Sequence, residues 1–202
     1  MSLKVFVLGP LNTNSYLLWD RGEAVVIDPG GEPGELISFI KSSNLNLKYV
    51  ISTHGHFDHV LGVKELVRIT GAKFYLNFKD VDLMPLFYDW REKPPAPHDD
   101  LRDGQEFRFG SQILQAVSTP GHTMGSTSLL WGGKMFTGDT LFKGTVGRYD
   151  LGGDREVLRE TLEKLKGMDI NEIYPGHGDT TSLKEELKSN PFLNGVVGPD
   201  DW

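Results

Sequence analysis

Thr53-His54-Gly55-His56-Phe57-Asp58-His59 holds the densest group of metal-binding side chains in this chain of 202 residues. Neither the 3.6-residue period of a helix nor the alternation of a strand brings its three histidines and its aspartate to one face. A loop that runs into a helix does, with His54 and His56 projecting from the loop and Asp58 and His59 reaching the other side. Such a stretch can supply ligands to two metal ions about 3.5–4 Å apart, the spacing that two-metal hydrolytic sites require.

Three more potential ligands lie in short polar loops next to predicted strands. They are His122 in Gly121-His122-Thr123, Asp139 in Thr137-Gly138-Asp139-Thr140, and His177 in Gly176-His177-Gly178. Loops that leave one edge of a sheet can build a single site from distant sequence positions. The chain has no cysteine, which excludes thiolate ligands and thiol nucleophiles and leaves zinc, iron or manganese as candidate metals. The sixth histidine, His98, is expected to be a surface residue.

The hydrophobic pattern predicts an α+β fold in which strands cluster in each half of the chain and helices follow each cluster. The most economical architecture is a pair of mixed sheets covered by helices on both outer faces, as one domain over residues 1–202. Residues 80–103 are the least regular part, because four prolines interrupt them. Strands are expected at Val5–Leu8, Ser15–Trp19, Glu23–Asp28, Tyr49–Ser52, Lys73–Leu76, Glu106–Phe109, Ile113–Ser118, Ser126–Trp131, Lys134–Thr137 and Glu172–Tyr174, and helices at about 33–43, Leu61–Ile69, Arg155–Leu165 and Leu183–Lys188.

The charge and hydropathy of the chain limit the kinds of partner it is expected to bind. The chain carries 21 basic and 28 acidic residues, a net charge of -7, so its surface disfavours binding to nucleic acid. No apolar run approaches the ~18 residues of a membrane span, and the N-terminus has no basic segment leading into an apolar one. We therefore expect a cytoplasmic protein that acts on a small molecule, with no membrane or nucleic-acid partner. The sequence leaves its oligomeric state open, since Phe87, Tyr88 and Trp90 could cap the site or form a contact.

The ligand pattern resembles the metallo-β-lactamase superfamily, and Asp28 before Pro29-Gly30-Gly31 resembles the second motif of that superfamily. Three further stretches resemble the glyoxalase II (hydroxyacylglutathione hydrolase) branch, and are closest to its short bacterial members: Thr119-Pro120-Gly121-His122-Thr123, Phe136-Thr137-Gly138-Asp139-Thr140-Leu141-Phe142 and Gly147-Arg148. Larger members carry a C-terminal helical domain that supplies much of the glutathione site. Only 24 residues follow Gly178 here, too few for such a domain.

The resemblance implies a four-layer αββα sandwich and two divalent metal ions, zinc first, with iron or manganese as alternatives. One ion would be held by His54, His56 and His122, and the second by Asp58, His59 and His177. Asp139 would bridge both, and Asp58 would also count as a catalytic residue. Asp28 would orient the histidine loop by hydrogen bonds without being a ligand. Substrate would be bound by Lys143, Arg148 and Tyr149.

The implied activity is hydrolysis of a thioester, S-lactoylglutathione or a similar hydroxyacyl thioester, by a hydroxide that bridges the ions. Two alternatives stay open. One is a persulfide dioxygenase of the same fold with a single iron held by His56, His122 and Asp139, and the other is a metallo-hydrolase of another ester or lactone. A serine hydrolase is unsupported, because Ser126 and Ser128 lack the Gly-x-Ser-x-Gly elbow.

Overall fold

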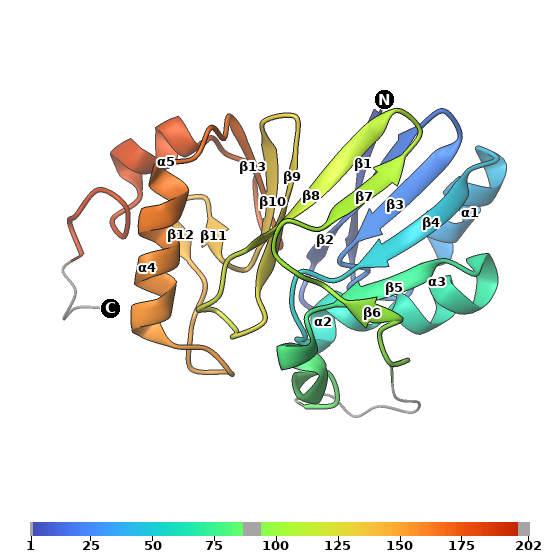
Figure 1. Cartoon of the computed structure of the whole chain (residues 1–202), viewed down its shortest axis with the longest axis horizontal. Helices are drawn as coiled ribbons and strands as arrows, with labels where there is room; N and C mark the ends of the chain where they lie inside the picture. Colours follow the sequence, from blue (N-terminus) through green and yellow to red (C-terminus); the bar gives the residue numbers. More distant parts are fainter. Residues whose placement is uncertain (1, 87–93, 198–202) are drawn as a thin grey trace.

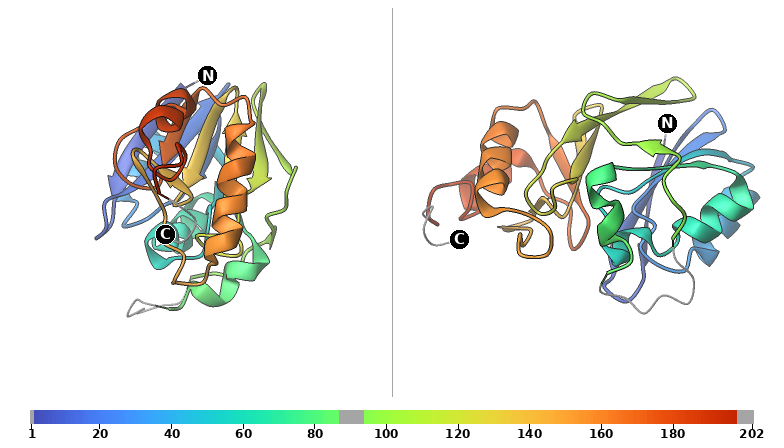
Figure 2. Two further views of the ribbon diagram at one scale, coloured as in Figure 1. Left: turned by 90° about the vertical axis from the view of Figure 1, so that its left-hand side faces the viewer. Right: turned by 60° about the horizontal axis from the view of Figure 1, so that its bottom comes forward.

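Two β-sheets packed face to face form the centre of the structure, and helices cover both outer faces (Figures 1 and 2). This computed structural model describes residues 2–86 and 94–197. Phe87, Tyr88 and Trp90, for which the sequence suggests two roles, lie outside the described residues.

The first sheet has six strands in sequence order, and its N-terminal part is antiparallel whereas its C-terminal part is parallel. The turn between its second and third strands is made by Arg21 and Gly22, both with positive φ, as two-residue hairpins of this kind require. The strands are β1 (Ser2–Leu8), β2 (Thr13–Asp20), β3 (Glu23–Ile27), β4 (Asn46–Ile51), β5 (Lys73–Leu76) and β6 (Asp99–Asp100).

The second sheet has five strands in the order β13-β10-β9-β8-β7, with one parallel pair, β10 and β13. Both sheets are therefore mixed, as the sequence predicts. A separate two-stranded hairpin joins this sheet to the next helix. The strands are β7 (Glu106–Phe109), β8 (Gln112–Ser118), β9 (Thr127–Trp131), β10 (Lys134–Gly138), β13 (Glu172–Pro175) and the hairpin strands β11 (Leu141–Phe142) and β12 (Thr145–Val146).

Alternating apolar residues explain the layers. In β3, Val25 and Ile27 pack into the core between the two sheets, while Ala24 and Val26 face the helices on the other side. This period-2 alternation is what a strand buried on both faces needs. A third apolar cluster, which includes Leu158 and Leu162, fills the space between the second sheet and its helices. Three apolar interfaces thus separate four layers, which confirms the αββα sandwich.

Helices α1 (Gly34–Ser42) and α3 (Val63–Thr70) lie on the outer face of the first sheet. Helices α4 (Arg155–Lys166) and α5 (Leu183–Ser189) lie outside the second sheet, at the other end of the molecule in Figure 1. Within the described part of the chain, no helix has the length and apolar character needed to cross a membrane.

Three sequence expectations need correction. The helix expected at Leu61–Ile69 begins two residues later, as α3, and an unexpected short helix, α2 (Phe57–Val60), precedes it. Between the two helices the Gly62 amide donates to the Pro29 carbonyl at 2.7 Å. The irregular stretch 80–103 overlaps a 3₁₀ helix, η1 (Phe78–Leu83), and includes strand β6. Strands β11 and β12 were not expected, since each has only two residues.

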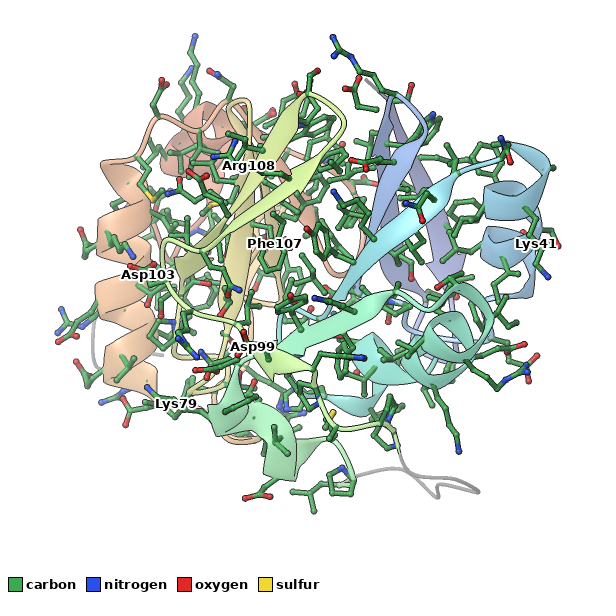
Figure 3. The ribbon with its side chains drawn as sticks, turned by 45° about the vertical axis from the view of Figure 1, so that its right-hand side comes forward. Lys41, Lys79, Asp99, Asp103, Phe107 and Arg108 are labelled. Atoms are coloured by element: carbon green, nitrogen blue, oxygen red, sulfur yellow. The ribbon has the colours of Figure 1, made fainter. Side chains whose placement is uncertain are left out.

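The packing between the sheets can be tested at Phe107. Its ring is 2% exposed, points into the space between the sheets (Figure 3), and lies 5.2 Å from the Tyr49 ring and 4.8 Å from the Tyr75 ring. Phe107→Ala should lower the free energy of unfolding by about 3–5 kcal/mol, through lost contacts and a cavity. Urea denaturation measures this change.

Val7→Ala is the control, because Val7 is 60% exposed. It should change stability by less than about 0.5 kcal/mol. Equal losses in the two variants would show that the interface between the sheets does not stabilise the fold as described.

Candidate metal centre

The potential ligands converge because several strands end at one edge of the sandwich. His54 to His59 follow β4, His122 follows β8, Asp139 follows β10 and His177 follows β13. Strands β8, β10 and β13 run in the same direction, since β8 and β10 both pair antiparallel with β9. Two backbone hydrogen bonds join the sheets at this edge, from Asn14 to Gly176 at 2.7 Å and from Thr127 to Thr53 at 2.9 Å.

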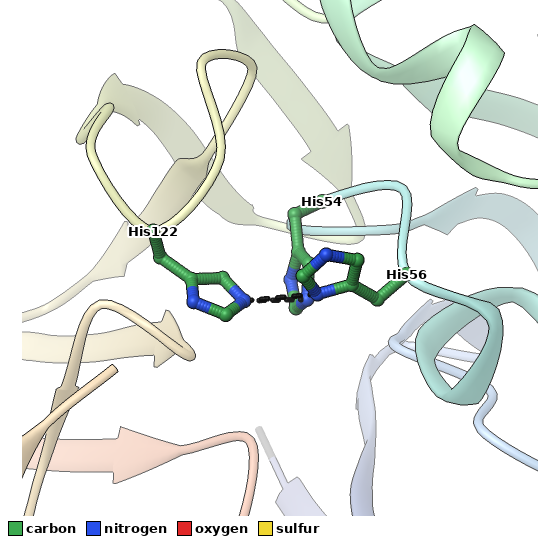
Figure 4. Close-up of side chains that lie close together, drawn as sticks. All are labelled: His54, His56 and His122. Carbon is green, nitrogen blue, oxygen red and sulfur yellow. Dashed lines mark hydrogen bonds between the residues drawn. The ribbon is translucent and has the colours of Figure 1, made fainter. Parts of the chain in front are cut away.

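His54, His56 and His122 form the first group (Figure 4). The His122 Nε2 atom lies 3.2 Å from His54 Nε2 and 3.0 Å from His56 Nδ1. A tetrahedral zinc ion with zinc–nitrogen bonds of ~2.0–2.1 Å holds its ligand atoms ~3.3 Å apart. Both separations are therefore those of ligands around one small cation, and the ligand atoms of the group all lie within 4.8 Å of one another.

Asp58, His59 and His177 form a second group beside the first. Asp58 Oδ2 lies 3.4 Å from His59 Nε2 and 3.2 Å from His177 Nε2. Asp139 lies between the groups: one of its carboxylate oxygens is 3.3 Å from His59 Nε2, and the other is 3.5 Å from His177 Nε2 and 3.8 Å from His122 Nε2. Asp139 also forms a third group with His54 and His59. The structure thus brings all seven predicted ligands together.

Four of the five histidines place their other ring nitrogen against a carbonyl or hydroxyl oxygen of the protein. His56 Nε2 lies 2.8 Å from the Leu151 carbonyl, His122 Nδ1 2.6 Å from the Arg148 carbonyl, and His177 Nδ1 3.1 Å from the Leu11 carbonyl. His54 Nδ1 lies 3.1 Å from the Thr53 hydroxyl. A carbonyl can only accept, so these contacts leave the inward nitrogens of His56, His122 and His177 unprotonated in the neutral ring. Metal-binding histidines are oriented in this way.

Asp28 lies behind the second group. Its Oδ2 atom is 3.0 Å from His59 Nδ1, and its two oxygens accept from the Thr53 amide at 2.7 Å and the Thr53 hydroxyl at 2.8 Å. Its φ of 49° is in the left-handed region, which aspartate tolerates better than most residues. This position fits the expected orienting role and keeps Asp28 outside all three ligand groups.

Buried polar atoms show that the site suits a cation. Both ring nitrogens of His59 and one oxygen of Asp139 are buried without a hydrogen bond of good geometry, although His59 Nε2 and Asp139 Oδ1 lie 3.3 Å apart. Buried polar atoms are almost always paired, so unpaired ones need an explanation. A divalent cation between them would satisfy both. The donor set of imidazoles and carboxylates is that of a zinc, iron or manganese site.

Burial and nearby charges shift the histidine pKa values of the two groups in opposite directions. Burial lowers the pKa of His54 well below 6.5 and that of His122 to about 4. Burial also opposes the charged form of His59, but the surrounding carboxylates outweigh it and hold the His59 pKa well above 6.5. At His177, hydrogen bonds to Asp139 and Asp58 outweigh burial and raise the pKa to about 9. At neutral pH, His54 and His122 are therefore neutral, whereas His177 carries a proton.

A cavity of about 270 Å³ opens onto the donor atoms. Arg148, one of the three predicted substrate-binding residues, lines it. Lys143 lines an adjoining cavity of about 300 Å³ that shares Phe142 and His177 with the first. Tyr149 is half-buried and is not among the residues that line either cavity. His98 is exposed, as expected.

The apolar wall of the cavity was not anticipated. It consists of Leu11, Phe57, Phe142 and Leu151. Phe57 and Phe142 each sit within three residues of a ligand, and that proximity is a signal by which sequence reasoning could have found them. Leu11 and Leu151 carry no such signal, because only the tertiary fold brings them to the site.

The fold and this site define a metal-dependent hydrolase of one superfamily. Residues 8–177 match the family described as Metallo-beta-lactamase superfamily, and the chain belongs to that superfamily. Among curated relatives, the hydroxyacylglutathione hydrolase GloC of Haemophilus influenzae is 33% identical over 96% of this chain and 99% of its own length.

Two solved structures share the whole architecture. The B3 metallo-β-lactamase BLEG-1 superposes with a TM-score of 0.87 at 31% identity, over 96% of this chain and 100% of that one. TTHA1623, solved in a di-iron-bound form, gives a TM-score of 0.85 at 36% identity, over 94% of this chain and 100% of that one.

Metal uptake should depend on pH differently at the two groups. A ligating histidine must be neutral, so binding at Asp58, His59 and His177 has to displace the His177 proton below about pH 9. Affinity there should fall about tenfold or more for each pH unit below 9. His122, with a pKa of about 4, stays neutral from pH 5 upward and imposes no such loss on the first group.

Calorimetric zinc titrations between pH 6 and 8.5 would measure the two affinities. Buffers of different ionisation enthalpy would count the protons released. Two affinities that fell in parallel as the pH was lowered would contradict the described charge states.

Proposed function

We propose that the protein hydrolyses a thioester, S-lactoylglutathione or a similar hydroxyacyl thioester, as a binuclear metallo-hydrolase. The observation that carries this proposal is the complete set of seven donor residues in adjoining groups, five of which line one cavity. In this scheme His54, His56 and His122 hold one divalent ion, Asp58, His59 and His177 hold the second, and Asp139 contacts both. Zinc is the first candidate, with iron and manganese as alternatives. The match to GloC over nearly its whole length supports the substrate class.

The protein residues would hold and orient the reacting groups. When bound, divalent ions supply Lewis-acid chemistry, lowering the pKa of water and polarising a carbonyl. Asp58 receives a hydrogen bond from the Thr13 hydroxyl at 3.2 Å, which fixes the oxygen that faces His177. Asp28 Oδ2, 3.0 Å from His59 Nδ1, restrains the His59 ring by a charge contact. These contacts place the donor atoms before substrate arrives, which reduces the reorganisation that catalysis would otherwise need.

Serine side chains do not support covalent catalysis here. Ser126 and Ser128 are buried, and neither lines the cavity. The Ser128 hydroxyl lies 2.9 Å from the Thr119 hydroxyl, and that of Ser126 lies 2.7 Å from the Thr123 hydroxyl. Water is therefore the nucleophile that the site favours.

The cavity suits a substrate with an apolar part next to the cleaved bond. A volume of about 270 Å³ accommodates a small acyl group, and the adjoining cavity beside Lys143 and Asp179 gives the thiol part a place to lie. Arg148 and Lys143 are the candidate contacts for an anionic thiol such as glutathione. Each is already paired, Arg148 with Asp150 and Lys143 with Asp179.

Steady-state hydrolysis of S-lactoylglutathione by zinc-loaded protein tests the activity. Asp139→Ala should lower kcat/KM by more than about 100-fold, because it removes the carboxylate that faces both groups, and even indirect partners of a metal ligand are worth ~10–100-fold. The same variant controls for contaminating activity.

No turnover above Asp139→Ala would refute this substrate. The next assays would then be other thioesters and lactones, and oxygen uptake by iron-loaded protein with glutathione persulfide, which is the reaction of the alternative dioxygenase.

The role of Arg148 can be separated from the chemistry by changing its partner. Both carboxylate oxygens of Asp150 accept from the Arg148 guanidinium at 2.6 Å, so a substrate carboxylate must compete with Asp150. Asp150→Asn should lower KM for a glutathione thioester about two- to fivefold, the range expected for an exposed ion pair, and leave kcat unchanged.

A thioester with an uncharged thiol is the matched control substrate, and its KM should not change. An unchanged KM for the glutathione thioester in Asp150→Asn would show that Arg148 does not bind the substrate.

A further inference from the structure

Asp80 is a fully buried carboxylate in η1, outside every ligand group. Its Oδ2 atom accepts from the Gly55 amide at 3.0 Å and from the Thr123 hydroxyl at 2.6 Å. Its Oδ1 atom accepts from the Gly125 amide at 2.8 Å. Gly55 lies between His54 and His56 in the sequence, and Thr123 follows His122. One side chain thus joins the two loops that supply the whole first group.

Close packing shows that both loops are shaped to this carboxylate. A Cβ atom on Gly55 would lie 2.3 Å from the Asp80 carbonyl oxygen, and a Cβ atom on Gly125 would lie 2.5 Å from Asp80 Oδ1. Both distances are far below van der Waals contact, so only glycine lets either loop come this near. The two loops belong to different sheets, since one follows β4 and the other joins β8 to β9.

We propose that Asp80 is a positioning residue that holds the two histidine loops in register and so sets the metal affinity of the His54, His56 and His122 group. This inference rests on the proposed function, in which these three histidines hold one ion. Asp80 touches backbone and hydroxyl groups next to the ligands, and its effect passes through the placement of their rings. Partners of this kind are worth ~10–100-fold in metal affinity.

The chemistry requires a carboxylate at this position. Three donors from the loops converge on two acceptor oxygens. Asparagine would offer one oxygen, and its amide N–H₂ would face either the Gly55 or the Gly125 N–H group. Asp80→Asn therefore leaves at least one buried amide unpaired while it preserves the size of the side chain.

The second group should not depend on Asp80, because other residues hold it. Thr13 contacts Asp58, Asp28 contacts His59, and the Leu11 carbonyl contacts His177. A loss of affinity confined to one group is thus the signature of positioning, which general destabilisation would not produce.

The experiment measures both zinc dissociation constants of the full chain, by chelator competition, in wild type and Asp80→Asn. His122→Ala serves as a reference that shows which constant belongs to the first group. The matched control is Asp20→Asn, another buried carboxylate that accepts from the Ser111 amide and hydroxyl at 2.8 Å. Asp20 lies at the far end of β2 from Thr13, about 23 Å along the strand.

We expect Asp80→Asn to weaken the first constant by about 10–100-fold and to leave the second at its wild-type value. Asp20→Asn should change neither. Unchanged constants in Asp80→Asn, or equal losses in both, would overturn the inference and leave the proposed function standing. If wild-type protein binds no ion through the three histidines, the proposed function fails, and the inference fails with it.

A second pair of variants covers the case in which Asp80→Asn does not fold. Thr123→Ser keeps the hydroxyl that donates to Asp80, and Thr123→Val removes it with little change in size. Thr123→Ser should retain the wild-type first constant, while Thr123→Val should weaken it. Equal first constants in these two variants would overturn the inference.

Discussion

The structure depends on burying a group of ionisable side chains at the edge where its two sheets meet. Five of these side chains are at most 7% exposed, His54, His56, Asp58, His59 and His122, and Asp139 has an oxygen with no hydrogen-bond partner. Removing such groups from water is costly unless other charges or bonds compensate. Part of the compensation is internal, because His59 lies among three carboxylates that favour its charged form. The His59 Nε2 nitrogen and the Asp139 Oδ1 oxygen, which have no hydrogen-bond partner, are the atoms that a bound cation would compensate most.

Holding these groups in place requires both sheets at once. Asn14 in the first sheet donates its side-chain amide to the Pro175 and Gly178 carbonyls, on either side of His177. Tyr16, also in the first sheet, donates its hydroxyl to the Pro175 carbonyl at 2.6 Å. The apolar core between the sheets and the site at its edge are therefore one structure. A change that shifts one sheet against the other would separate ligands that belong to a single group.

Much of the fold and of the candidate site could be predicted from the sequence. The features that could not be predicted depend on contacts between distant parts of the chain. The strands Lys73–Leu76 and Glu106–Phe109 have the predicted bounds, because turn residues flank short apolar or alternating runs. The candidate ligands could be picked out because imidazole and carboxylate groups are rare at such density. Asp80 could not, because it lies among prolines and charged residues in a stretch without periodicity. Its importance comes from contacts with loops 25 and 43–45 residues away in the sequence.

The C-terminal helix α5 and the residue that follows it order the β11–β12 hairpin. Glu186 in α5 is 1% exposed and accepts from the Gly144 amide at 2.8 Å, next to Lys143. Asn190, just after α5, donates to the Thr145 carbonyl at 3.1 Å and to Glu186 at 2.8 Å. These bonds fix the β11–β12 hairpin from behind, while Phe142 and Lys143 face the cavities. One short helix thus supports, from outside the second sheet, a hairpin whose Phe142 lines both cavities and whose Lys143 lines the adjoining one.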